Sequence, residues 1–369
     1  MIKYLYANNY KSFVNFRIDF DQSNLLIGKN GAGKSNVFAL IASLRDIING
    51  GGQRLNELFP RLTLNRWMKS NIQTFELGIG NEEDHFVYKI EIEHDLEKSV
   101  NRIATEKVYH WDTVIYQMIN GNAEVLDDEG NNSRVLADSN TSGVAFVPID
   151  GRHSLLGKFR NQIASIILCT PDPRKMTDII QNDVYMPRTD FSNIASVYSG
   201  VVQLDPEIYK ELAETYRDVS PGFVKARISI EPFNKHLTLD YKYKDVDCSY
   251  LFSELSDGEK MLFALYILLY GFIGKGMTVL LDEPDNFLSL REIQPWCINV
   301  GSMLEKGGQC IMISHHPEVI DYMAETDGIW MTRLDSGESK ITEKPNVGVN
   351  EDLLTYSEMI SRGLLDEIE

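Results

Sequence analysis

The stretch Gly28-Lys29-Asn30-Gly31-Ala32-Gly33-Lys34-Ser35 decides the fold of this chain. It matches the pattern G-x-x-x-x-G-K-[ST], in which a glycine-rich loop cradles phosphate groups. The apolar residues 24–27 before it predict a buried strand, and residues 36–42 after it predict the opening of a helix. Backbone N–H groups and the helix dipole then favour an anion at the same point. We therefore expect this loop to bind a nucleotide.

Each residue type in the loop has an expected role. Lys34 is expected to reach the β- and γ-phosphates, and the Ser35 hydroxyl to hold Mg²⁺. A chance match of the pattern is the alternative, and the flanking strand and helix count against it. The expected nucleotide-binding residues of this segment are Asn30, Gly31, Ala32, Gly33, Lys34, Ser35 and Asn36.

Two adjacent carboxylates end a second apolar strand, in Thr278-Val279-Leu280-Leu281-Asp282-Glu283-Pro284. In a parallel sheet, ligands bind beyond the carboxyl ends of the strands. We expect Asp282 to hold Mg²⁺ and Glu283 to polarise the attacking water. The alternative is a strand-end turn that carries two acids before a proline. The glycine loop upstream counts against this alternative.

The segment Leu255-Ser256-Asp257-Gly258-Glu259 precedes a strongly apolar helix. One interpretation is a capping box, S-x-x-E, at a helix N-terminus. A second is that Ser256, the Gly258 N–H and the helix dipole form another phosphate-binding surface, since glycine permits close backbone approach. Local chemistry does not separate the two interpretations.

Histidines follow a third apolar strand, in Ile313-Ser314-His315-His316-Pro317. At the carboxyl edge of a sheet, His315 could reach a γ-phosphate, although paired histidines are more often not catalytic. Joint metal ligation by His315 and His316 is not expected, because adjacent side chains on an extended chain point to opposite sides.

The pattern along the chain indicates an α/β fold. Residues 75–147 are mostly of period two, which predicts antiparallel strands with a hairpin turn at Asn120-Gly121. Residues 154–216 are expected to be mainly helical, broken by Pro171, Pro173 and Pro187, and strand–helix alternation after residue 257 predicts a parallel sheet. The first strands are expected within residues 2–20, and the last twenty residues to form a terminal helix.

Composition limits the partners. The net charge of −18 argues against wide, non-specific nucleic-acid binding, but it leaves a local basic patch open. Two basic runs, Arg54/Arg61/Arg66/Lys69 and Arg152/Lys158/Arg160, are interpreted as solvated faces. Four unpaired cysteines, no leader pattern and no apolar run long enough for a bilayer lead us to expect a cytoplasmic protein without membrane contact.

These four segments, in this order, resemble the ABC-type ATPases, with Leu255–Glu259 as the signature, Asp282-Glu283 as the acidic pair and His315 as the switch histidine. The resemblance implies that the cofactors are ATP and Mg²⁺. It also implies a homodimer whose two ATP sites are composite, with Ser256, Gly258 and Glu259 completing the partner's site. Glu283 and His315 are then the catalytic residues, and Ser35 and Asp282 the metal ligands.

The opening Asn9-Tyr10-Lys11-Ser12-Phe13 resembles that of the RecF, SMC and OLD-type ATPases, where the basic residue lies near the nucleotide, here Lys11. The implied fold is a P-loop ABC-type ATPase head with a β-rich first lobe and a helical insertion. We expect one ATPase domain over 1–369: a P-loop and β-rich lobe (1–150), the insertion (151–225), the signature and histidine lobe (226–345) and a tail (346–369). Gln73 and Gln162 are both candidates for the family's glutamine loop.

The family resemblance also suggests a role. Compact bacterial ATPases of this group occur in phage-defence operons, so we expect ATP-dependent dimerisation to control a separate effector, a nuclease or a toxin, in antiviral defence or DNA repair. Nucleic-acid binding stays open. The alternatives are an ATP-dependent sensor or scaffold with incidental hydrolysis, and a transporter subunit, which the long interval between Lys34 and Ser256 disfavours.

Overall fold

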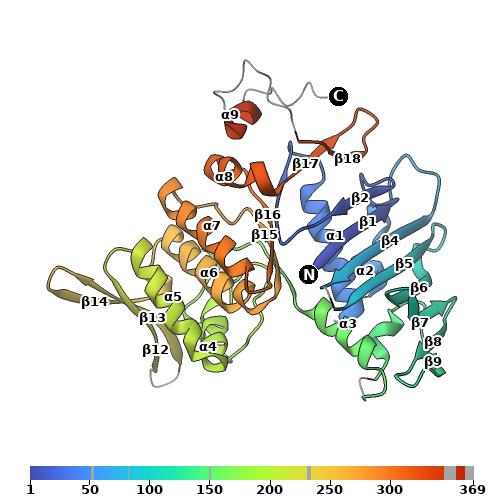
Figure 1. The fold of residues 1–369 in the computed structure, drawn as a ribbon, viewed down its shortest axis with the longest axis horizontal. Coiled ribbons are helices and arrows are strands. Elements are labelled where there is room, and N and C mark those ends of the chain that lie inside the picture. The colour runs from blue at the N-terminus through green and yellow to red at the C-terminus, as the bar shows by residue number, and fades with distance from the viewer. Residues whose placement is uncertain (51–53, 82, 149–150, 231–233, 345–354, 362–369) are drawn as a thin grey trace. The chain divides into compact units, whose positions relative to one another are not determined.

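The computed structural model describes residues 1–50, 54–81, 83–148, 151–230, 234–344 and 355–361 (Figure 1). Backbone contacts divide the chain into two compact units. The first comprises residues 1–21, 28–166 and 329–343, and the second residues 22–27, 167–328 and 344–369.

The first unit is built on an eight-stranded antiparallel sheet in the order β2-β1-β4-β5-β6-β7-β8-β9. The period-two pattern is confirmed, because buried and exposed side chains alternate along its long strands. At the tip between β7 and β8, Asn120 and Gly121 both have positive φ, as a tight hairpin turn requires. The strands are β1 (Ile2–Asn8), β2 (Phe16–Asp19), β4 (Ile72–Gly80), β5 (His85–Asp95), β6 (Val100–His110), β7 (Thr113–Ile119), β8 (Asn122–Leu126) and β9 (Asn132–Leu136).

Helices and a hairpin complete the first unit. Helix α1 (Lys34–Asn49) follows the glycine loop, as expected, and ends at Gly50 in the left-handed conformation. Gly51 and Gly52, which follow in the sequence, lie outside the described residues. The other elements are α2 (Leu55–Leu58), η1 (Arg61–Thr63), η2 (Gly143–Phe146), α3 (Ser154–Ala164), β17 (Gly328–Arg333) and β18 (Ser339–Thr342), the last two paired as an antiparallel hairpin.

The second unit contains the parallel strands that the sequence predicts. Strands β15 (Thr278–Asp282) and β3 (Ser23–Ile27) lie on either side of β16 (Gln309–Ile313), all parallel, and β10 (Ile166–Cys169) lies beside β15. Asp282 pairs with Ile313, and Ile313 with Leu26. The carboxyl ends of these three strands therefore meet at one edge.

Helices pack around these strands. Helix α6 (Asp257–Gly271) is buried from Lys260 to its end, and Trp296 on α7 (Leu290–Leu304) donates to the Leu265 carbonyl. No helix of the described residues is long and apolar enough to cross a membrane. The remaining elements are β11 (Ile179–Ile180), α4 (Ile194–Leu204), α5 (Pro206–Val219), β12 (Phe223–Ile230), β13 (Lys235–Tyr243), β14 (Val246–Leu251), η3 (Phe252–Glu254), η4 (Ile273–Lys275), α8 (Pro317–Asp327) and α9 (Tyr356–Ser361).

The helices expected within residues 154–216 are present as α3, α4 and α5, and the expected break at the three prolines lies between α3 and α4. Residues 165–193 contain two short strands and a series of turns. Pro171, Pro173 and Pro187 fall in this interval, and each proline removes a helical N–H donor and disfavours helix in the residue before it.

A carboxylate is buried in the sheet of the first unit. Glu106 on β6 has no exposed surface and accepts hydrogen bonds from the hydroxyls of Tyr88, Tyr116 and Ser142 and from the Gly143 N–H. These bonds tie η2 to the strands. Burial raises the pKa of Glu106, and the hydrogen bonds oppose that rise.

We predict that Glu106→Ala lowers the free energy of unfolding by about 3 kcal/mol, because it leaves several buried donors unsatisfied. Chemical denaturation measures this. The matched control is Glu124→Ala on β8, whose side chain is 40% exposed and whose loss should change stability by about 0.5 kcal/mol or less. Equal effects of the two substitutions would contradict the structural role of Glu106.

Candidate functional site

The phosphate loop of the first unit requires its glycines. Gly33 has φ +107°, and a Cβ there would lie 2.7 Å from the Ser339 hydroxyl oxygen. A Cβ at Gly28 would lie 2.2 Å from the Met331 carbonyl oxygen. The loop thus packs closely against the β17–β18 hairpin, and any larger side chain at these two positions displaces backbone or Ser339.

The N-terminus of α1 has the features of an anion site. Gly33 occupies the N-cap position and provides no capping side chain. The Lys34 ammonium is buried and donates to the carbonyl oxygens of Gly28 (2.6 Å) and Lys29 (3.2 Å). Gly31 and Ser35 are exposed. This combination of an uncapped helix, a lysine curled into the loop and an exposed hydroxyl fits a polyphosphate.

Lys11 lies beside this loop. Its ammonium donates to the Asn36 amide oxygen at 2.9 Å, on the first turn of α1. Its backbone has φ +48° and is fixed by a hydrogen bond from the Lys11 N–H to the Thr63 carbonyl. Partial burial lowers the pKa of Lys11. The structure thus brings together Lys11 and the loop, two segments that the sequence analysis joined only through the family resemblance.

Asn65 supports Lys11 and was not foreseen from the sequence. Its amide donates to the Lys11 carbonyl at 2.9 Å, and its own N–H donates to the Asn9 side chain. Buried asparagines that bind backbone across a loop fix its shape. A single asparagine in a loop segment has no sequence signal that separates this role from ordinary turn chemistry.

The acidic pair lies in the second unit, at the end of β15. Asp282 is the last residue of that strand, and Glu283 follows with φ +50°, an unusual conformation for a residue with a side chain. The Glu283 N–H donates to the Ile313 carbonyl at 2.8 Å, and its exposed carboxylate accepts from the Asn286 amide at 2.8 Å. Such strain is typical of functional positions. Asn286 is a further residue that the sequence analysis did not assign.

The donor atoms present suit a hard cation. Ser35 offers a hydroxyl at the start of α1, and Asp282 offers a carboxylate at the end of β15. Mg²⁺ takes oxygen ligands and few protein groups, with phosphate oxygens completing its shell. Each residue is therefore an oxygen donor of the kind that Mg²⁺ takes, and their binding of one ion stays a prediction.

The segment before α6 forms the capping box. The Ser256 N–H and hydroxyl donate to the Glu259 carboxylate at 2.9 and 2.7 Å, and the Glu259 N–H donates back to the hydroxyl at 3.3 Å. The capping interpretation is thus confirmed. A Cβ at Gly258 would lie 3.0 Å from the Phe287 carbonyl, so this turn packs against the loop after Glu283. A phosphate contact by Ser256 and Gly258 stays a prediction.

His315 lies at the same sheet edge as Asp282, because its strand pairs in parallel with β15. Its side chain is exposed, whereas the preceding Ser314 is buried. The Ser314 hydroxyl accepts from the His316 N–H at 3.0 Å. The His315 side chain is thus exposed, whereas the residue before it is buried and hydrogen-bonded to the residue after it.

Gln73 is not available to a ligand. It has no exposed surface, its amide donates to the carbonyl oxygens of Asn9 and Thr63, and its Oε1 contacts His94 Nε2 at 2.9 Å. Gln73 therefore fixes the backbone of the segment that carries Lys11. Because its side chain is fully buried, the prediction that it could be the glutamine-loop residue was wrong. Gln162 on α3 has a buried Oε1 with no partner among the described residues.

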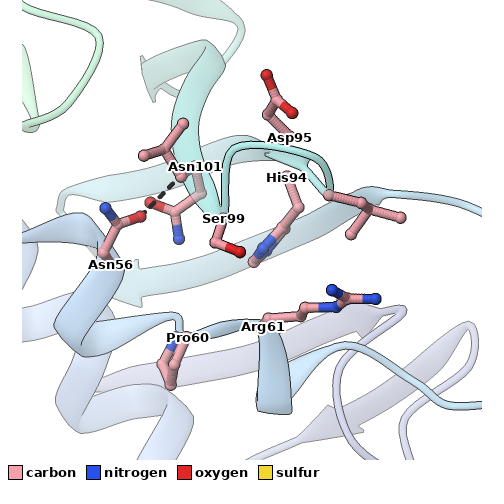
Figure 2. Close-up of a pocket in the computed structure, with 9 residues that line it drawn as sticks. Asn56, Pro60, Arg61, His94, Asp95, Ser99 and Asn101 are labelled. Carbon is pink, nitrogen blue, oxygen red and sulfur yellow. Dashed lines mark hydrogen bonds between the residues drawn. The ribbon is translucent and has the colours of Figure 1, made fainter.

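A separate small pocket lies in the first unit, and Figure 2 shows its lining and the hydrogen bond from the Asn101 N–H to the Asn56 side chain. Its volume is about 120 Å³. It involves Arg61 of the first basic run but no residue of the phosphate loop. The lining is Asn56, Pro60, Arg61, His94, Asp95, Leu96, Ser99, Val100 and Asn101.

Two family models match the chain. The model described as "AAA ATPase domain" matches residues 1–162, and "AAA domain, putative AbiEii toxin, Type IV TA system" matches residues 249–321. The first range contains the phosphate loop, and the second contains Ser256, Glu283 and His315. No curated protein matches at a significant level.

Solved structures with the same fold are heads of SMC proteins. An SMC head bound to the C-terminal winged-helix domain of ScpA is 17% identical, with a TM-score of 0.53 over 92% of this chain and 97% of that one. The SMC head domain from Thermotoga maritima is 16% identical, with a TM-score of 0.50 over 92% and 98%. An SMC head with an extended coiled coil, bound to the C-terminal domain of ScpA derived from Pyrococcus furiosus, is 15% identical, with a TM-score of 0.50 over 100% and 99%.

The fold prediction is confirmed by these findings. The chain has the α/β head fold of SMC proteins, and the two family models add AAA-type ATPase sequence character at both ends of it. The chain therefore has the fold of an SMC head and resembles AAA ATPase domains in residues 1–162 and 249–321.

We predict that Ser256→Ala lowers the free energy of unfolding by about 1 kcal/mol, because it removes the N-cap acceptor of α6. Thermal or urea unfolding measures this. The control is Ser302→Ala, at an exposed position within α7 that caps nothing. No difference between the two variants would show that the capping box contributes nothing to stability.

Proposed function

We propose that this protein binds ATP at residues 28–35, hydrolyses it with Glu283, and uses ATP-dependent dimerisation to control a separate effector protein. The observation that carries the proposal is the parallel arrangement of β3, β16 and β15. Strand β3 leads directly into the phosphate loop, and β15 ends in Asp282 at the same edge. This is the position at which open α/β sheets bind ligands.

The proposed roles follow from the chemistry of each side chain. Lys34 and the α1 N-terminus bind the phosphates, and Lys11 adds positive charge beside Asn36. Ser35 and Asp282 hold Mg²⁺, which when bound supplies charge neutralisation to the phosphates. Glu283 orients the water and accepts its proton, with Asn286 holding the carboxylate. His315 contacts the γ-phosphate.

Dimerisation is proposed from the signature segment. In the ABC-type ATPases that the chain resembles, this segment completes the ATP site of a second subunit. Ser256, Gly258 and Glu259 would contribute the same contacts here, from the N-terminus of a helix whose dipole favours phosphate. In the capping box the Ser256 hydroxyl donates its one proton to the Glu259 carboxylate, so a phosphate contact by this hydroxyl replaces that bond while the hydroxyl still accepts from the Glu259 N–H.

The effector is proposed from two indications. Two of the matched SMC heads were solved with ScpA, a separate partner protein. The second family model is named for a putative toxin of a toxin–antitoxin system, which supports a role in antiviral defence more than one in DNA repair. A nuclease or toxin is the proposed effector, in the cytoplasm. An ATP-dependent scaffold with incidental hydrolysis is the second candidate.

We predict that Glu283→Gln binds ATP as the wild type does and hydrolyses it about 10² to 10⁴ times more slowly, because the amide keeps the shape and loses the base. Lys34→Ala is instead expected to lose nucleotide affinity. Phosphate release and equilibrium binding of a labelled ATP measure the two effects. Wild-type turnover by Glu283→Gln would exclude the proposed base, and a wild type that binds ATP without turnover would favour the scaffold.

We further predict complementation between two inactive chains, Lys34→Ala and Ser256→Asp. Aspartate is a good N-cap, so α6 stays intact, but its charge repels the partner's phosphate. Each variant alone should be inactive, and the mixture should recover part of the ATPase activity through dimers with one complete site. The control is a mixture of Lys34→Ala with Glu283→Gln. No recovery, from chains that stay monomeric with ATP, would rule out the composite site.

A further inference from the structure

Arg174 is a cation of the second unit that the proposed chemistry does not use. It lies between β10 and β11, and its side chain contacts two loops of the candidate site. Its Nε lies 3.6 Å from the carboxylate of Asp257, the first residue of α6. Its guanidinium carbon lies 5.1 Å from the centre of the Phe287 ring. One side chain therefore contacts both the turn before α6 and the loop after Glu283.

The contact with Phe287 matters because that residue is strained. Phe287 has φ +77°, and its side chain is 43% exposed. A bulky residue keeps such a backbone only where its surroundings hold it. Its carbonyl lies against the Gly258 turn, and the Arg174 cation lies over its ring, where the ring quadrupole attracts it. Contacts on the backbone and on the ring thus fix Phe287 against the turn before α6.

The turn that carries Arg174 is itself fixed. The Arg174 N–H donates to the Asp172 carboxylate at 3.1 Å, and the Lys175 N–H donates to the Asp172 carbonyl at 3.0 Å. The Asp172 N–H donates to the Asp190 carbonyl at 3.0 Å, and the Lys175 ammonium lies 3.8 Å from the Asp190 carboxylate. Proline at position 173 further limits the backbone. The guanidinium is therefore presented from a backbone with few alternative conformations.

A short path leads from Phe287 to Glu283. Asn286, the residue before Phe287, donates its side-chain amide to the Glu283 carboxylate at 2.8 Å. The Asn286 N–H also donates to the Glu283 carbonyl at 3.3 Å. A displacement of Phe287 therefore moves the residue that holds the Glu283 carboxylate.

We propose that Arg174 is a positioning residue, which fixes Phe287 against the turn before α6 and so keeps Asn286 and Glu283 in place. This rests on the proposed function, because it assigns Arg174 to the same hydrolysis. Arg174 acts through Phe287 and contacts no substrate.

The first test compares Arg174→Ala with Arg174→Lys in the full chain with saturating Mg²⁺ and ATP. Two surface contacts of this kind together account for about a five- to tenfold effect, so we expect Arg174→Ala to lower kcat by about that factor. Affinity for a labelled ATP should stay within about twofold, because no residue of the phosphate loop changes. Arg174→Lys should recover most of the rate, since an ammonium keeps both attractions.

The matched control is Arg188→Ala. Arg188 is exposed in the same interval and has no ion pair among the described residues, so its loss should leave kcat unchanged. Equal losses in Arg174→Ala and Arg188→Ala, or the wild-type kcat in Arg174→Ala, would overturn the inference.

A double variant tests the route through the aromatic ring. If Arg174 acts by fixing Phe287, Arg174→Ala combined with Phe287→Leu should be no slower than Phe287→Leu alone. Losses that multiply fully would mean that Arg174 acts by another route, such as its own contact with a phosphate, and would refute the positioning role.

Hydrogen exchange separates this inference from the proposed function. The amides of Asn286 and Leu288, which donate to the carbonyls of Glu283 and Asp285, should exchange faster in Arg174→Ala than in the wild type or in Arg188→Ala. This difference does not depend on hydrolysis. If the wild type does not hydrolyse ATP, the proposed function fails while faster exchange still supports the held loop. Unchanged exchange at both amides would refute the positioning role by itself.

Discussion

The parallel pairing of β3, β16 and β15 is the constraint on which the candidate site depends. Its register pairs Asp282 with Ile313 and Ile313 with Leu26, so three chain segments leave the sheet at one edge. A slip of one residue in β15 would turn Asp282 to the opposite face of the sheet. The apolar side chains of all three strands are buried, which fixes this register through packing. The positions of residues 282–285 and 314–316 are thus fixed by core residues that take no part in the proposed chemistry.

Local patterns explain why much of this structure could be predicted from the sequence. The strand at 309–313, the turn at Asn120-Gly121 and the capping box at Ser256 each depend on residues within a few positions of one another. Long-range contacts could not be predicted in this way. Gln73 is indistinguishable in sequence from an accessible glutamine, and only the folded sheet buries it behind the Lys11 loop.

Strained backbone conformations occur both beside the phosphate loop, at Lys11, and at Glu283, the proposed base. Lys11, Glu283 and Phe287 have φ values of +48°, +50° and +77°, which residues with a Cβ adopt at an energetic cost. No propensity scale places lysine, glutamate or phenylalanine there. At Glu283 the hydrogen bond to Ile313 and the contact with Asn286 hold the conformation, and at Lys11 the bonds to Thr63 and Asn65 do so. The surrounding fold therefore determines these conformations, and the sequence patterns that reveal the motifs do not.

The inward-turned Lys34 has a consequence for which anions the loop can accept. Its ammonium is already solvated by two carbonyl oxygens of the loop itself, so an anion gains only the difference between its own bonds and those it displaces. An anion that contacts the ammonium alone, such as chloride or bicarbonate, gains little free energy beyond that of the carbonyl contacts it displaces. In the proposed function, the linked phosphates of a nucleotide would contact the ammonium, the uncapped helix and Lys11 at once, so that the separate contacts reinforce one another. The same hydrogen bonds within the loop therefore favour a polyphosphate over a small monovalent anion at this lysine.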